Sequence, residues 1–268
     1  MTAIEVQDRC KNTLVEICCA SAEDVQEAAR GGADRVELNS GMFFGGLTPS
    51  IGTLEVALTA GIPIMAMVRP RPGGFCYTNT EFRVMLRDAQ CLLDHGAKGI
   101  VFGCLHEDGT VDKERVKEML DVIGGAESVF HRAIDVTPDW KSALQTLMEL
   151  HVTRVLTSGQ AANAPLGMDA ISQMICFAGE KIEILPGAGI KLQNARKIIE
   201  ATGCSQIHLS AGRIQVTDPS CANDRDIRFT GMTCPPEDRY EITHAEAVAA
   251  VIATVRNWKS DKKEGYLP

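Results

Sequence analysis

Positive charge and long apolar runs are both scarce in this chain of 268 residues. No apolar run approaches the roughly 20 residues that a membrane-spanning helix needs, so we expect no membrane partner. The 27 Lys and Arg residues against 35 Asp and Glu leave a formal net charge of −8. Because binding to phosphate backbones needs a basic surface, this balance argues against a nucleic-acid partner.

Patterned cysteines are also lacking. The ten cysteines are scattered, with no CxxC pair and no Cys/His cluster at zinc spacing. Residues 1–13 are polar and show no basic-then-apolar pattern, so we expect no signal peptide. We therefore predict a protein of the cytoplasm, with the nucleus as a second location, in which the cysteines are reduced thiols.

The sequence does contain one pattern, here called a phrase, that occurs four times: the end of a helix, a Gly-rich or small-residue turn, an apolar strand, and then small polar residues. The phrase occupies residues 30–41, 94–104, 150–159 and 202–212. Four further short apolar runs lie between these phrases, at 14–19, 63–68, 128–133 and 182–187. About eight alternations of strand and helix predict an α/β protein, a single-domain (β/α)8 TIM barrel. An open doubly wound sheet is the alternative.

The predicted domain organisation follows from this pattern. We predict that residues 1–13 form a polar leader, that residues 14–258 form the barrel domain, and that residues 259–268 form an exposed tail. The segment 211–239 is too long for a plain βα loop, so we expect a lid, a subunit contact or partial disorder there. Helices are predicted at 22–30, 81–95, 113–123, 139–150, 192–201 and 243–259.

Polar side chains recur at the inward positions of several predicted strands. Alternation along a strand places Glu16 with Cys18, and Glu37 with Asn39, on one face. A barrel that needed only stability would fill these positions with Val, Ile and Leu, so we predict a functional cavity at the C-terminal mouth. A purely structural ion-pair network, in which Glu16 and Glu37 are only partners of Arg35 and Arg69, is the alternative. The other polar residues expected near this mouth are Arg35, Arg69, Arg71, His131, His208 and Ser210.

A mouth of this kind suits either acid–base catalysis or the binding of an anion. Because buried charges need partners, we expect Glu16 and Glu37 to pair with Arg69 or Arg71, and the histidines to contact the carboxylates. If the protein is an enzyme, the acid–base and clamp candidates are Glu16, Glu37, Arg69 and His131. The Gly-rich turns after the last two strands favour an anion site, for which the candidates are Arg71, Gly187, Gly189, Ser210 and Arg213.

A set of unusual motifs runs through the chain in order: VEICCAS, GGADRVEL, GGLTPS, RPRPGGFCY, FHRAID, RVLTSGQ and PGAGI. On these motifs the sequence resembles the copper homeostasis protein CutC family over Leu14–Arg228. The resemblance implies a (β/α)8 barrel and a cytosolic protein of copper tolerance that binds Cu(I). It also implies a homo-oligomer, a dimer or a tetramer.

The resemblance implies a Cu(I) site made by two cysteines at the ends of the first two strands. Here the first matches Cys18, whereas Asn39 stands at the second position. Cu(I) prefers thiolate and thioether ligands, so an amide is a poor substitute. Three alternatives follow: weaker binding, completion of the site by Cys19 or Cys104, or a function other than copper. We take Cu(I) binding as the first hypothesis, with Cys18 and Cys19 as ligands, and an enzyme acting on a small phosphorylated or anionic metabolite as the second.

Overall fold

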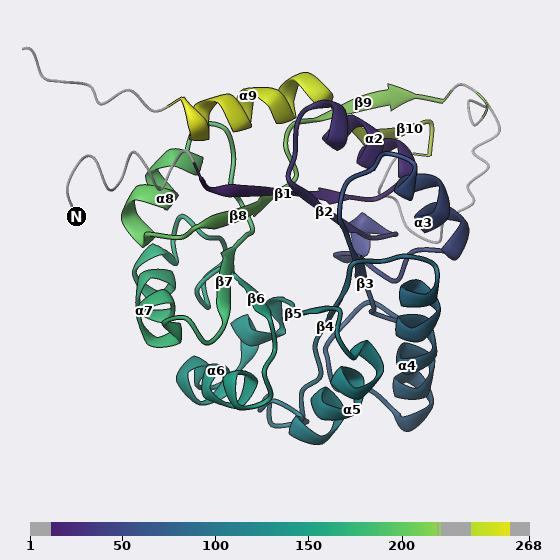
Figure 1. Cartoon of the computed structure of the whole chain (residues 1–268). Coiled ribbons are helices and arrows are strands. Elements are labelled where there is room, and N and C mark those ends of the chain that lie inside the picture. Colours follow the sequence, from purple (N-terminus) through teal and green to yellow (C-terminus); the bar gives the residue numbers. More distant parts are fainter. Residues whose placement is uncertain (1–11, 219, 221–236, 258–268) are drawn as a thin grey trace, which may run out of the picture.

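The computed structural model describes residues 12–218, 220 and 237–257. Eight parallel strands curl into a barrel with helices outside it, which confirms the predicted fold (Figure 1). The strands are β1 (Leu14–Cys19), β2 (Arg35–Leu38), β3 (Ile64–Met67), β4 (Gly99–Phe102), β5 (Glu127–Phe130), β6 (Arg154–Thr157), β7 (Glu183–Pro186) and β8 (Gln206–Leu209). The sheet order is β7-β6-β5-β4-β3-β2-β1-β8, and β7 contacts β8 at the seam.

The helices cover the outside of this ring. They are α2 (Ala22–Arg30), α3 (Ile51–Leu58), α4 (Asn79–Asp94), α5 (Lys113–Ile123), α6 (Trp140–Glu149), α7 (Met168–Ala178), α8 (Ala195–Thr202) and α9 (Ala245–Arg256), with short 3₁₀ turns η1 (Met42–Phe44) and η2 (Arg132–Val136). None of the helices in the described part of the chain is long and apolar enough to cross a membrane.

Side-chain caps fix where several helices begin. Ser21 caps α2, since its side chain accepts a hydrogen bond from the Asp24 N–H. Thr78 and Glu81 form a reciprocal capping box, so α4 begins at Asn79, two residues earlier than predicted. The helix predicted at 192–201 begins three residues later, at Ala195. Its first residues instead form a turn held by Asn194, which accepts from the Lys191 N–H and donates to the Gly189 carbonyl.

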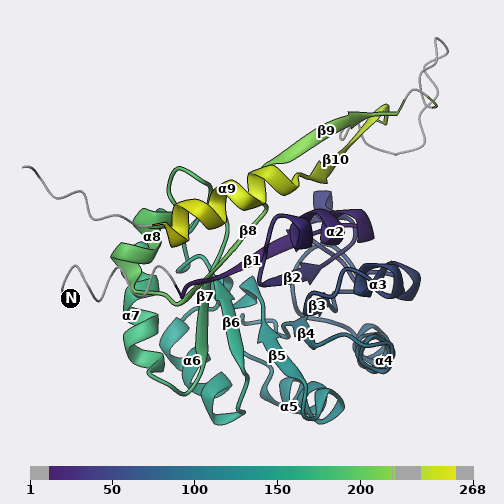
Figure 2. The same ribbon diagram turned by 45° about the horizontal axis from the view of Figure 1, so that its top comes forward.

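A two-stranded antiparallel ribbon projects from the barrel beside α2 and α9 (Figure 2). It consists of β9 (Arg213–Thr217) and β10 (Arg239–Thr243). The buried Asp24 carboxylate anchors its base, since it pairs with Arg213 at 2.9 Å and accepts from the Thr243 N–H at 2.6 Å. Strand β9 lies within the segment 211–239, for which a lid, a subunit contact or partial disorder was expected, and β10 begins at the last residue of that segment. Residues 219 and 221–236 lie outside the described residues, as do most of the predicted leader and all of the predicted tail.

The interior of the barrel is divided between an apolar and a polar side. Strands β3 to β7 contribute a separate apolar cluster of Met65, Met67, Val101, Val129, Leu156 and Leu185. On β8, β1 and β2 the inward positions hold charged and polar groups, among them Glu16, Arg35 and Glu37, each at most 5% exposed. Because burying unpaired charge is strongly unfavourable, this side of the barrel must satisfy its charges internally or with a ligand.

Candidate functional site

A cavity of about 810 Å³ lies at the C-terminal mouth of the barrel, where the sequence predicts one. Its walls include the ends of β1, β2, β3, β5 and β8 and the loops after β7 and β8. The chemically active side chains that line it are Cys18, Glu37, Asn39, Arg69, His131 and His208. All six are more than nine-tenths buried, so the mouth gathers polar groups that have little contact with bulk solvent.

Glu16 lies below this cavity and anchors its charge network. Its carboxylate pairs with Arg35 and accepts a hydrogen bond from His208 Nδ1 at 2.8 Å. Burial alone would raise the pKa of Glu16, but the His208 hydrogen bond and the Arg35 charge outweigh burial and lower this pKa to about 2. Glu16 is therefore a carboxylate under all ordinary conditions.

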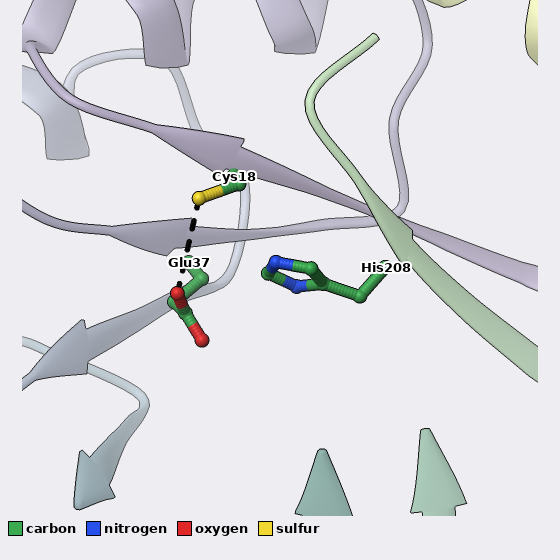
Figure 3. A group of neighbouring side chains, drawn as sticks. All are labelled: Cys18, Glu37 and His208. Atoms are coloured by element: carbon green, nitrogen blue, oxygen red, sulfur yellow. Dashed lines mark hydrogen bonds between the residues drawn. The ribbon is translucent and has the colours of Figure 1, made fainter. Parts of the chain in front are cut away.

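His208 takes the opposite charge. Burial alone would lower its pKa, but the Glu37 charge and the hydrogen bonds with Cys18 and Glu16 raise the pKa well above its ordinary value. The ring is thus an imidazolium whose Nδ1 is committed to Glu16. Figure 3 shows the other ring nitrogen directed towards Cys18 and Glu37.

Glu37 is the least satisfied member of this group. Its Oε1 accepts from Asn39 Nδ2 at 2.9 Å, whereas its buried Oε2 has no partner among the described residues. Burial raises the pKa of Glu37, so its proton is held more tightly than that of an exposed carboxyl. A buried carboxyl with one free oxygen beside an imidazolium can exchange a proton with a ligand.

The Cys18 sulfur lies at the centre of a compact set of donor atoms. Cys18 Sγ is 3.8 Å from Met42 Sδ, 3.9 Å from Glu37 Oε1 and 3.5 Å from Asn39 Nδ2. One donor atom each from Cys18, Glu37 and His208 lies within 4.8 Å of the other two (Figure 3). Burial raises the pKa of the Cys18 thiol, so the proton is held on the sulfur more tightly than on an exposed cysteine.

The structure does not bring the other expected sulfurs to this site. Cys19 follows Cys18 on β1, so strand alternation turns it outward, where it is fully buried in the hydrophobic core. Cys104 is also part of this outer core. The sequence-based expectation that Cys19 or Cys104 completes a Cu(I) site is therefore corrected. The sulfur that lies beside Cys18 belongs to Met42, in the loop after β2, which the sequence analysis did not identify.

The arginine partners also differ from the expectation. Glu16 pairs with Arg35, because the parallel register of β1 and β2 places these two residues opposite each other. Arg71 pairs instead with Glu81, on α4. Arg69 donates to the carbonyl oxygens of Phe44, Gly46 and Gly73 at 2.8, 3.0 and 2.8 Å. The predicted pairing of Glu16 and Glu37 with Arg69 or Arg71 is wrong.

Of the residues predicted to bind an anion, Gly189 and Ser210 line the cavity. Gly187 makes room for the site, since a Cβ there would lie 2.6 Å from Leu156 Cδ1 and 3.3 Å from His208 Cδ2. Arg213 does not line the cavity, because Asp24 holds it at the base of the ribbon. Arg71 is likewise absent from its walls. Two cations that the sequence analysis missed, Arg132 and Lys191, line the cavity instead.

His131 contributes a neutral ring to the mouth. Its Nδ1 accepts from the Ala133 N–H at 3.1 Å, which leaves the proton on Nε2. Burial and the nearby Arg69 charge lower the pKa of His131 to about 3, so the ring stays neutral. The expectation that both histidines contact carboxylates therefore holds for His208 and not for His131.

Fold and site together define a (β/α)8-barrel protein whose mouth gathers a thiol, a thioether, an imidazole and a carboxyl group. The chain belongs to the CutC family, whose sequence profile it matches over residues 13–213. It is 46% identical to a CutC family protein of Treponema denticola over 246 residues, which cover 91% of this chain and all of the relative. A CutC family protein of Mesorhizobium japonicum is 38% identical over 244 residues, 91% of this chain and 94% of that relative.

Solved structures agree with this family membership. A crystal structure from Streptococcus agalactiae, described as a candidate copper homeostasis protein CutC, superimposes with a TM-score of 0.71 at 30% identity and covers 74% of this chain and 98% of that chain. A candidate deoxyribose-phosphate aldolase of Coccidioides immitis superimposes with a TM-score of 0.57 at 13% identity, over 76% of this chain and 83% of that one. This second likeness shows the shared barrel fold alone.

Proposed function

We propose that this protein binds Cu(I) at Cys18 and holds the ion for sequestration or handover. The observation that carries the proposal is the sulfur pair at the cavity wall, in which the buried Cys18 Sγ lies 3.8 Å from Sδ of the partly buried Met42. Thiolate and thioether are the ligands that Cu(I) prefers. The S. agalactiae relative's description as a candidate copper homeostasis protein supports the same reading.

The spacing of the sulfurs suits a three-coordinate ion. With metal–sulfur bonds of about 2.3 Å, as in zinc–thiolate sites, a trigonal ion separates its sulfur ligands by about 4 Å. A Glu37 oxygen, or His208 Nε2 once the incoming ion displaces its proton, is near enough to Cys18 to supply the third donor. Asn39, at the position where the resemblance implies a second cysteine, donates to Glu37 and Cys18 and so orients both. In this chain Met42 takes the role of the second soft ligand.

Location and assembly are also part of the proposal. A Cu(I)–thiolate site needs a reducing compartment, which agrees with the cytoplasm or nucleus expected from the sequence. The family resemblance further leads us to expect a homo-oligomer, a dimer or a tetramer.

Titration of the fully reduced protein with Cu(I) against a competing chelator tests this function. We expect one tightly bound Cu(I) per chain, and we expect Met42→Leu to weaken binding by at least about tenfold, or 1.4 kcal/mol. Met67→Leu is the matched control, because Met67 also lines the cavity but belongs to the apolar cluster. Absence of stoichiometric uptake by the wild-type protein, or equal affinities for the two variants, would contradict the proposal.

An enzyme is the second candidate function, and the unpartnered Glu37 Oε2 favours it. A cavity of about 810 Å³ is of the size that holds a small organic ligand, well beyond the needs of one ion. Glu37 would act as the acid–base group, with the buried Glu16–His208 pair fixing the charge beside it. This candidate replaces copper binding if the chelator competition finds no Cu(I) uptake.

A further inference from the structure

The part of the cavity wall formed by Arg69, Phe75 and His131 has no role in the copper site. The Arg69 guanidinium carbon lies 5.5 Å from the centre of the Phe75 ring, and that ring lies 4.7 Å from the His131 ring. All three residues line the cavity. They follow or end strands β3 and β5, whereas Cys18 and His208 lie on β1 and β8. We refer to these three residues as the donor wall.

Arg69 brings a buried positive charge to this wall without a countercharge. It is 7% exposed and forms no ion pair with any residue of 12–218, 220 or 237–257. Its two terminal nitrogens are engaged by backbone carbonyl groups, while its Nε is buried without a partner there. Carbonyl dipoles stabilise a cation only in part, so a buried guanidinium of this kind favours the arrival of an anion.

His131 adds a second unused donor. Because Nδ1 accepts from the Ala133 N–H, the neutral ring carries its proton on Nε2. This Nε2 is buried and has no partner within the described residues. The donor wall thus offers one fixed positive charge, two unsatisfied N–H groups and an aromatic face. Buried donors without acceptors are unfavourable by themselves, and a ligand oxygen removes that penalty.

We propose that the donor wall binds the oxyanion of a small organic ligand, a carboxylate or a phosphate group. Arg69 supplies the charge and His131 the neutral donor, while Phe75 packs against the apolar part of the ligand. Of the cations expected from the sequence to bind an anion, Arg71 and Arg213 are held by Glu81 and Asp24 outside the cavity. Arg69 keeps the clamp role predicted for it, and His131 becomes a neutral donor instead of an acid–base group. This assignment goes beyond copper binding and does not depend on it.

The test is calorimetric titration of copper-free protein, kept with a metal chelator at constant ionic strength, with inorganic phosphate and with acetate. We expect saturable binding of at least one anion, weakened at least about tenfold in His131→Asn, since a hydrogen bond to a charged group is lost. Asparagine keeps an acceptor for the Ala133 N–H but does not reach the Nε2 position. In His131→Gln the amide nitrogen takes the Nε2 position, so we expect binding to be largely retained.

Two control variants test whether the loss of anion binding is specific to the donor wall. Arg83→Met removes an exposed cation of α4 that does not line the cavity, so anion binding should be unchanged. Cys18→Ser should also leave it unchanged, which separates this inference from the copper proposal. Saturation by phosphate alone identifies a phosphoryl ligand, and saturation by acetate alone a carboxylate; either supports the inference. No saturable binding of either anion, or equal affinities in wild type and His131→Asn, overturns it.

Discussion

Cys18→Ser should lower the Cu(I) affinity of the reduced protein by at least about 100-fold, or about 2.7 kcal/mol. The substitution replaces a soft thiolate ligand by a hard hydroxyl of nearly the same size. Among the cysteines that the structure describes, Cys18 alone lines the cavity, so no other of these thiols can take its place. The measurement is competition with a Cu(I) chelator under strictly reducing conditions.

Cys19→Ser is the matched control for this prediction. Cys19 is the next residue on the same strand and equally buried, but it faces the core between sheet and helices. Its substitution should affect the free energy of unfolding and leave the Cu(I) affinity within a few fold of the wild-type value. Equal losses of affinity in the two variants, or full affinity in Cys18→Ser, would show that copper does not bind at the mouth.

Arg35→Met should lower the free energy of unfolding by about 3–5 kcal/mol, because it removes the guanidinium that pairs with the buried Glu16 carboxylate and leaves His208 as its remaining ionic partner. Arg35 is 5% exposed and donates to both Glu16 and Gln206. Urea denaturation measures the difference. Arg71→Met is the control: its ion pair with Glu81 is partly exposed to solvent, so its removal should change stability much less. A loss in Arg35→Met as small as in the control would contradict the account of the buried network.

The Glu16–Arg35 pair also predicts how the free energy of unfolding depends on pH. The pKa of Glu16 falls from 4.5 to about 2 in the folded protein because the His208 hydrogen bond and the Arg35 charge outweigh burial. The stability contributed by this shift is present above pH 4.5 and is lost as pH falls towards 2. In Arg35→Met the folded-state pKa of Glu16 rises, so less stability remains to be lost over this interval. Unfolding free energies at several acidic pH values measure the difference, and parallel pH profiles for the two proteins would contradict it.

The barrel and the polar character of its mouth could be predicted from the sequence because both depend on local periodicity. Recurrent strand–turn phrases predict the eight strands, and alternation along each strand places Cys18 with Glu16 and Asn39 with Glu37. The same alternation could have excluded Cys19 as a partner of Cys18, since neighbouring strand residues face opposite sides. The choice of Cys19 as a ligand was therefore an error that the sequence itself could have prevented.

The pairings across strands could not be predicted in the same way. Glu16 meets Arg35 only because of the register between β1 and β2, which no local pattern specifies. Met42 reaches Cys18 because the loop after β2 turns back over the mouth, with Gly41 and Gly46 at φ values of 54° and 87°. A Cβ at Gly46 would collide with Asn39. The glycines allow a turn to be predicted from the sequence, but they do not show which side chain the turn brings to the mouth.

The location of the bound ion is the most direct measure of the central claim. Diffraction data at the copper absorption edge, from crystals of reduced protein loaded with one equivalent of Cu(I), would reveal it as an anomalous peak. We expect a single strong peak within bonding distance of Cys18 Sγ and Met42 Sδ. A peak only at another metal-binding group, such as the His106, Asp112 and Glu114 cluster, or at the exposed Cys76 or Cys176, would contradict it.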